Sequence, residues 1–277
     1  MGNLCQNSER AVFNRYFSGI LILLLSFMLQ NGCSTLELES QWCDREMTVD
    51  GKADDWHGAK YYLEDLYISV GLINDDQYLY VSLIAENPMT RAQIMRQGLI
   101  VWLDQKGGKE KAFGIKFPLS RQGDERLTRE SWGEFDREEA MERFQESLTE
   151  LEILGPKEEV VERVDIEEAR GIDVKLRMEG GLLVYELKVS LESGRDYPYA
   201  VGVKAGDWIG IGFESPKLEM ERPMGMRGGG MPGGGRMPGG GRGGMGMRAG
   251  MPQMPQQLKI WAKVRLASLD EASLNSF

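Results

Sequence analysis

Histidine and cysteine are scarce in this 277-residue chain, which contains one histidine, His57, and three cysteines, Cys5, Cys33 and Cys43. One histidine excludes a metal site built from several imidazoles. It also excludes a Ser-His-Asp triad that leaves a second histidine for another role. Three cysteines are too few for a fold held together by disulfides. Paired carboxylates occur only in solvated, acidic sequence, not beside apolar strand ends, so we predict that the protein is not an enzyme.

Basic residues are also fewer than acidic ones, 33 against 43, so the formal net charge is −10. This balance argues against a nucleic-acid partner. The acidity is concentrated at residues 121–170, where 17 Asp and Glu stand against 8 Lys and Arg. We expect a solvated, helical insertion there, with one amphipathic helix over Glu134–Ile153. The apolar residues that recur at helical spacing are Met141, Phe144, Leu148 and Leu151.

The longest early apolar run, Phe17–Leu29, has about 13 residues, which is short for a membrane span and typical of a signal-peptide core. We predict a signal peptide at 1–32, a polar tether at 33–41 and lipidation of Cys33, which follows the small residue Gly32. Cleavage without lipidation and an uncleaved anchor are the alternatives. An aspartate directly after the lipidated cysteine would resemble a signal for retention in the inner membrane, and this chain has Ser34 there. The prediction is therefore an extracytoplasmic protein tethered to the bacterial outer membrane.

Short segments rich in β-branched and aromatic residues fill much of the remaining chain. They predict a mainly β fold, an antiparallel β-sandwich of the immunoglobulin or jelly-roll kind, with one inserted helix. A single domain is expected over 42–270, followed by a tail at 271–277. The predicted strands lie at 42–49, 66–73, 77–84, 98–104, 112–117, 172–178, 182–191, 200–205, 208–214 and 258–267.

Residues 224–256 contain 14 Gly, 8 Met, 4 Arg and 4 Pro, with no acidic residue. Such a composition predicts a disordered loop before the closing strand, because it cannot bury enough apolar surface to offset its entropy. Thioether sulfur also suits Cu(I), so a weak metal site is the alternative reading. Its candidate ligands are Met224, Met226, Met245, Met247, Met251 and Met254.

Three motifs together resemble the family 9 carbohydrate-binding modules and the wider group of DOMON-like domains. They are the opening Asp50–Trp56, the strand Tyr78–Val81 and the strand Ile100–Asp104. The resemblance implies a β-sandwich in which Trp56 is an internal packing residue and Asp50 forms a turn. It also implies a non-catalytic module that binds a glycan. Trp102, on a strand that is apolar on both faces, is expected in the core as well.

Members of that family hold sugar between two aromatic rings, and this chain has no aromatic residue at the corresponding places, Ile94 and the 224–256 loop. The candidate sugar-binding rings are therefore Trp132, in a polar region, and Trp208, beside a turn. For each of these two rings, and for Trp261 on the alternating last strand, packing is the alternative that the sequence favours. A structural or protein-binding envelope lipoprotein without a sugar site is the alternative function. Calcium near Asn74–Asp76 is a further option, although a hairpin turn explains those residues equally well.

Overall fold

The computed structural model describes residues 36–119, 137–195, 197–216 and 257–270. The chain divides into two compact units, Met1–Leu36 and Glu37–Phe277, and apart from the first residue of β1 both sheets belong to the second unit. The expected signal peptide and Cys33 lie outside the described residues, as do Trp132, the 224–256 segment with its six candidate methionines, and the 271–277 tail. None of the described helices is both long enough and apolar enough to cross a membrane.

The described residues form two β-sheets, which confirms the predicted β-sandwich. The seven-stranded sheet has the order β1-β13-β12-β6-β7-β8-β9, and the six-stranded sheet has the order β10-β11-β5-β4-β2 with β3 paired to β4. In the six-stranded sheet, β2 pairs with β4 in parallel and the other neighbouring strands pair antiparallel. The strands of the seven-stranded sheet are β1 (Leu36–Glu39), β6 (Ile100–Asp104), β7 (Phe113–Lys116), β8 (Glu150–Leu154), β9 (Val160–Asp165), β12 (Trp208–Glu214) and β13 (Lys259–Arg265). Those of the six-stranded sheet are β2 (Gln41–Trp42), β3 (Lys60–Leu63), β4 (Ile68–Asn74), β5 (Tyr78–Ala85), β10 (Ile172–Glu179) and β11 (Leu182–Ser190).

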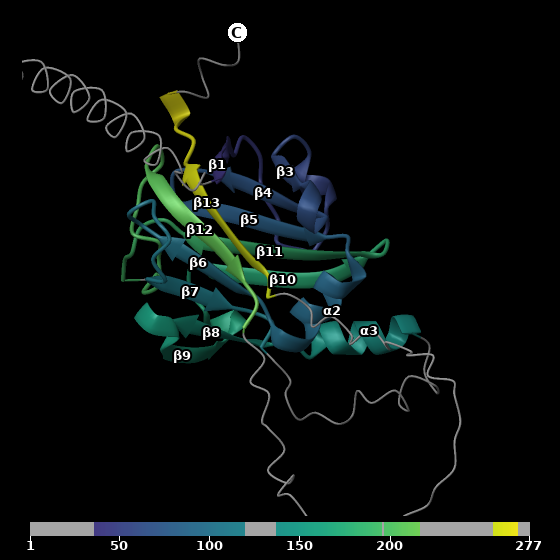
Figure 1. Cartoon of the computed structure of the whole chain (residues 1–277). Helices are drawn as coiled ribbons and strands as arrows, with labels where there is room; N and C mark the ends of the chain where they lie inside the picture. Colours follow the sequence, from purple (N-terminus) through teal and green to yellow (C-terminus); the bar gives the residue numbers. More distant parts are fainter. Residues whose placement is uncertain (1–35, 120–136, 196, 217–256, 271–277) are drawn as a thin grey trace, which may run out of the picture. The chain divides into compact units, whose positions relative to one another are not determined.

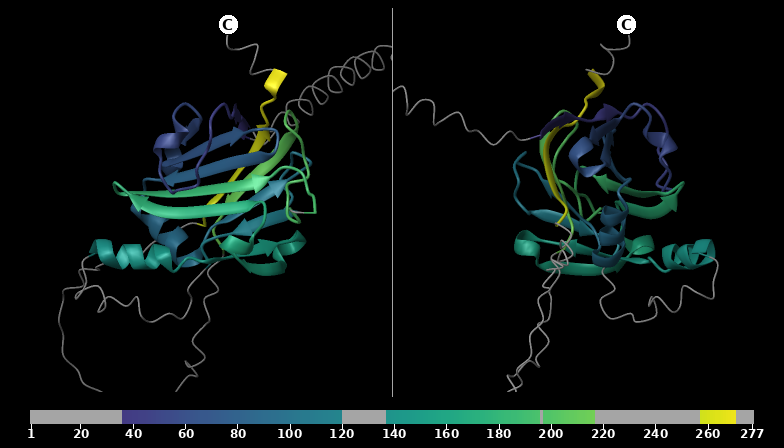
Figure 2. Two further views of the ribbon diagram at one scale, coloured as in Figure 1. Left: turned by 180° about the vertical axis from the view of Figure 1, so that it is seen from behind. Right: turned by 45° about the vertical axis from the view of Figure 1, so that its right-hand side comes forward.

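The core lies between the two sheets, which Figure 1 shows as separate layers and the right-hand view of Figure 2 shows nearly edge-on. Residues directly opposite each other in an antiparallel pair share a face. The register of the six-stranded sheet thus aligns Val70, Leu83, Tyr185 and Leu176 in one inward row, all at most 2% exposed. Phe117 meets this row from the other layer, with 6.4 Å between its ring centroid and that of Tyr185.

The hairpin of β4 and β5 confirms the hairpin prediction, and its turn follows from side-chain chemistry. The Asp75 carboxylate accepts hydrogen bonds from the backbone N–H groups of Gln77 (2.7 Å) and Tyr78 (2.6 Å). Asn74 Oδ1 accepts from Ala267 N at 2.9 Å. These bonds account for the polar residues proposed as calcium ligands. Among the described residues, no group of three or more His, Cys, Asp or Glu is arranged to hold a metal ion.

The acidic segment is only partly helical. Helix α3 spans Arg137–Glu146, so it ends before the expected boundary at Ile153. Glu150–Leu154 instead forms β8 and Val160–Asp165 forms β9, which together extend the seven-stranded sheet. The physical reason is that Leu151, Ile153 and Leu154 are buried on a sheet, a tertiary contact that overrides the helical spacing.

Other boundaries also differ from expectation. Leu36–Glu39, placed in the polar tether, is strand β1 because Leu38 is buried, and β2 covers only Gln41–Trp42 of the strand expected at 42–49. Residues 200–205 contain no strand. Helix α2, Pro88–Gln97, was not predicted; the Asn87 side chain caps it by accepting from Met89 N at 2.8 Å.

Candidate functional site

One face of the seven-stranded sheet combines an exposed and a partly exposed indole ring with the cations of β13. Along β13, Ile260, Ala262 and Val264 are buried, and the alternate residues point to the opposite side. In Figure 1 this strand (yellow) runs beside β12 (green). The outward side chains at this pair of strands, which we call the indole face, are Trp208, Lys259, Trp261, Lys263 and Arg265.

Glycine alternates with tryptophan across four neighbouring strands of this face. The register places Trp261 of β13 opposite Gly212 of β12, Gly212 opposite Trp102 of β6, and Trp102 opposite Gly114 of β7. A Cβ on Gly212 would lie 2.6 Å, 2.7 Å and 2.8 Å from three atoms of the Trp261 ring. Because these distances are nearly equal, the ring lies face-on over the glycine backbone. Each glycine therefore makes room for the indole of its neighbour.

Trp102 is the buried member of this row. It is fully buried, as predicted, but its ring lies on the outer side of the sheet rather than between the two sheets. Its ring packs with Ile100 and Leu154, and Trp261 packs against this cluster. Within the described part of the chain, the Trp102 Nε1 has no hydrogen-bond partner. Trp102 thus forms part of the buried cluster against which the more exposed Trp261 packs.

An ion pair lies beside Trp102, and its cation comes from the loop between β6 and β7. Lys111 Nζ lies 5.4 Å from the centre of the Trp102 ring and pairs with the carboxylates of Glu214 and Glu158. Partial burial would lower the pKa of Lys111, but its hydrogen bonds with the two carboxylates outweigh that effect and raise the pKa above its ordinary value. Lys111 therefore stays charged and neutralises Glu214, whose side chain is 4% exposed.

Trp208 stands at the other end of the indole face. It is 38% exposed, and Lys263 Nζ lies 4.2 Å from the centre of its ring, a cation–π contact. Lys263 also pairs with Glu37 of β1 at 3.3 Å. The β6–β7 loop borders Trp208 and is folded by Asp104, whose carboxylate accepts from the N–H groups of residues 106, 108 and 110. Trp208 is thus held on a defined surface with one ring face occupied by an ammonium group.

The structure brings the predicted Trp208 together with Trp261, which sequence reasoning had assigned to packing. Trp261 is both a packing residue and a surface residue, because it packs on Trp102 and is still partly exposed. The signal that could have found it is the alternation Lys-x-Trp-x-Lys-x-Arg in β13, which places one aromatic and three cations on a single face. The other expected ring position, Ile94, is a fully buried residue of α2.

A second aromatic cluster lies on the outer side of the six-stranded sheet. Lys188 Nζ lies 4.1 Å from the Tyr78 ring centre and 5.7 Å from that of Tyr80, and Tyr197 meets Tyr78 edge-on with 6.0 Å between centroids. A hydrogen bond with Tyr197, together with burial, raises the pKa of Tyr78 to about 12. Tyr80 is buried and Tyr78 only partly exposed, and the three rings contact one another and a cation.

The same outer side contains the Asp50–Trp56 segment, and the structure explains its residues. Trp56 is 2% exposed, which confirms the packing prediction, and its Nε1 donates to Glu186 at 2.6 Å. Glu186 also accepts from the backbone N–H groups of Asp50 and Gly51. Asp50 accepts from Lys52 N at 3.0 Å, as expected of a turn former. Trp56 covers the outside of the sheet, where the chain before β3 buries it.

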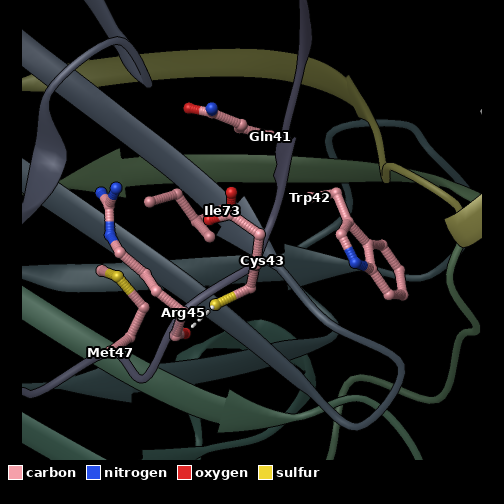
Figure 3. A pocket seen from close by; sticks show the side chains of 7 residues that line it. Gln41, Trp42, Cys43, Arg45, Met47 and Ile73 are labelled. Carbon is pink, nitrogen blue, oxygen red and sulfur yellow. Dashed lines mark hydrogen bonds between the residues drawn. The ribbon is translucent and has the colours of Figure 1, made fainter. Parts of the chain in front are cut away.

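A shallow hollow lies beside this region (Figure 3). It is lined by residues 41–45 together with Met47 and Ile73, and its cavity volume is about 10 Å³. Pockets for small molecules usually exceed about 300 Å³. Cys43 donates a hydrogen bond to the Arg45 carbonyl within it, and burial raises the pKa of the thiol. The hollow is too small to be preferred over the indole face as a ligand site.

No family model and no curated protein matches the chain. Among solved structures, it is similar to a family 9 carbohydrate-binding module from Caldicellulosiruptor kristjanssonii in complex with glucose, at 12% identity and a TM-score of 0.33 over 65% of this chain and 78% of that chain. A complex of such a module from the same organism with cellotriose gives the same identity and TM-score over 65% and 75% of the two chains.

Proposed function

We propose that this protein is a non-catalytic module that binds carbohydrate on the indole face. The observation that carries the proposal is the position of Trp261, whose ring lies face-on over Gly212 and so turns its other face away from the sheet. The C–H faces of a pyranose stack on such a ring, and nearby polar groups bind its hydroxyls. Trp208 and Lys263 supply a second ring and a hydrogen-bond donor on the same surface.

A glycan array probed with the full chain and with Trp261→Ala and Trp208→Ala tests this proposal. Loss of a fully engaged aromatic anchor is expected to weaken binding about tenfold or more. Tyr62→Ala is the matched control, because Tyr62 is 48% exposed on β3 of the other sheet. If both tryptophan variants still bind the same glycans, the binding site lies elsewhere on the protein. If no glycan retains the chain, the alternative function remains, a structural or protein-binding envelope protein.

The proposal includes attachment to the cell envelope through a lipid on Cys33, extracytoplasmic and at the outer membrane. Its support is the order of signals in the sequence, an apolar run followed by Gly32-Cys33. The prediction is that the protein from expressing cells partitions with membranes and incorporates labelled fatty acid, whereas Cys33→Ser does neither. Equal labelling of both forms would contradict the assignment of the anchor to this cysteine.

A further inference from the structure

Strand β13 of the indole face is positively charged, although the protein as a whole is acidic. The chain has a net charge of −10, yet β13 contains no acidic residue and directs three cations outward, Lys259, Lys263 and Arg265. Glu214 of β12 is buried and neutralised by Lys111. The exposed acidic residues of the neighbouring strand β1 are Glu37 and Glu39, and the exposed Asp207 precedes Trp208. We infer that the ligand of this face is an acidic glycan, a chain of sugars that contains uronic acids.

Spacing along the strand favours such a ligand over a single anion. Alternate residues of a strand lie about 6.8 Å apart, so the cations and Trp261 occupy a line of about 20 Å. A polymer of several sugar units can lie along this line, with the apolar face of one ring on Trp261 and carboxylates beside Lys263 and Lys259. Uronic acids combine these two features, an apolar ring face and a carboxylate.

Lys263 is the cation best placed to exchange partners. Its ion pair with Glu37 joins two partly exposed side chains, 36% and 59% exposed, and water screens such pairs strongly. A ligand carboxylate that is close to both Lys263 and an indole ring can therefore replace Glu37. The expected competition makes Glu37 a determinant of affinity, because removing its charge frees Lys263 for the ligand.

This inference rests on the proposed function, and one titration separates the two. The full chain is titrated with polygalacturonate and with its methyl-esterified form, which keeps the sugar backbone but removes the charge. We expect the acid to bind at least about tenfold more tightly than the ester at low salt, and its affinity to fall several-fold between about 20 and 200 mM NaCl. Equal affinity for acid and ester without salt dependence would overturn the acidic ligand and leave glycan binding intact.

Variants locate the effect on the face. Lys263→Gln is expected to weaken polygalacturonate binding about fivefold, and Glu37→Gln to strengthen it, whereas Lys60→Gln on β3 makes the same charge change on the other sheet and leaves it unchanged. Equal losses for Lys263→Gln and Lys60→Gln would overturn the inference by showing attraction to net charge alone. If neither polymer binds and the glycan array is also blank, the proposed function fails together with this inference.

Discussion

The ring of Trp261 lies face-on over the backbone of Gly212, so close that a methyl group on the glycine would occupy the space of the indole. This relationship links packing to the proposed function. The glycine fixes the ring parallel to the sheet, and the parallel ring is the surface on which a sugar can stack. The same arrangement recurs between Trp102 and Gly114, where the ring is buried.

Gly212→Ala is therefore expected to displace the Trp261 ring. Overpacking of this kind usually costs about 1–3 kcal/mol, and the displaced ring should also weaken glycan binding. Thermal or urea unfolding and the glycan titration measure the two effects. Gly194→Ala is the control, because no atom lies near a Cβ at that position, and its stability should change by less than about 0.5 kcal/mol. A variant as stable as the original, with unchanged binding, would show that the ring does not depend on this glycine.

Lys111→Met tests the ion pair beside the buried Trp102. It leaves the 4%-exposed carboxylate of Glu214 without its cation, and breaking a buried pair in this way costs about 3–5 kcal/mol. Glu158→Gln removes the other partner, which is 53% exposed, and should cost at most about 1 kcal/mol. Unfolding free energies of the two variants check the contrast, and similar costs would argue against a structural role for the Lys111–Glu214 pair.

The stability of the protein should depend on pH through Glu186. Burial raises the pKa of this carboxyl above its ordinary value of 4.5, although the hydrogen bonds from Trp56 and Gly51 oppose that effect. A raised folded-state pKa means that the folded protein binds the proton more tightly than the unfolded chain does. The contribution is therefore fully present below about pH 4.5 and is lost as the pH rises through the folded-state pKa.

Melting temperatures of the original protein and of Glu186→Gln, compared between about pH 4 and pH 8, measure this contribution. The amide does not titrate, so the difference between the two proteins isolates the carboxyl. We expect the original protein to lose stability relative to the variant as the pH rises. A relative gain would mean that the three hydrogen-bond donors, rather than burial, dominate the pKa of Glu186.

Much of the fold could be predicted from sequence because its strands obey simple periodicity. The hairpin of β4 and β5, with Asp75 in its turn, and the closing strand β13 were all readable. Helix α2 was missed although Asn87 and Pro88 form a typical helix start, since no apolar stripe follows them. Strand β8 was mistaken for helix because Leu148 and Leu151 match a helical period, and only the neighbouring strand shows otherwise.

The candidate site could be predicted only in part. Trp208 was found as an aromatic residue beside a turn. The alternation of β13 could also have placed Trp261 on an outer face, but it could not show that the ring lies over Gly212 of another strand. The row of three cations was readable from the alternation within β13, although acidic residues dominate the composition as a whole. Cross-strand register, which local sequence does not specify, sets the position of the Trp261 ring over Gly212.

The central claim, that glycan binds over Trp261 and Trp208, is tested most directly by fluorine NMR of the chain labelled with fluorotryptophan. Single Trp→Phe variants assign the resonances, and polygalacturonate oligomers and their methyl esters are the probes. The prediction is that the signals of Trp261 and Trp208 shift with saturation while that of the buried Trp56 stays fixed. Binding that moves neither Trp261 nor Trp208 would contradict the claim.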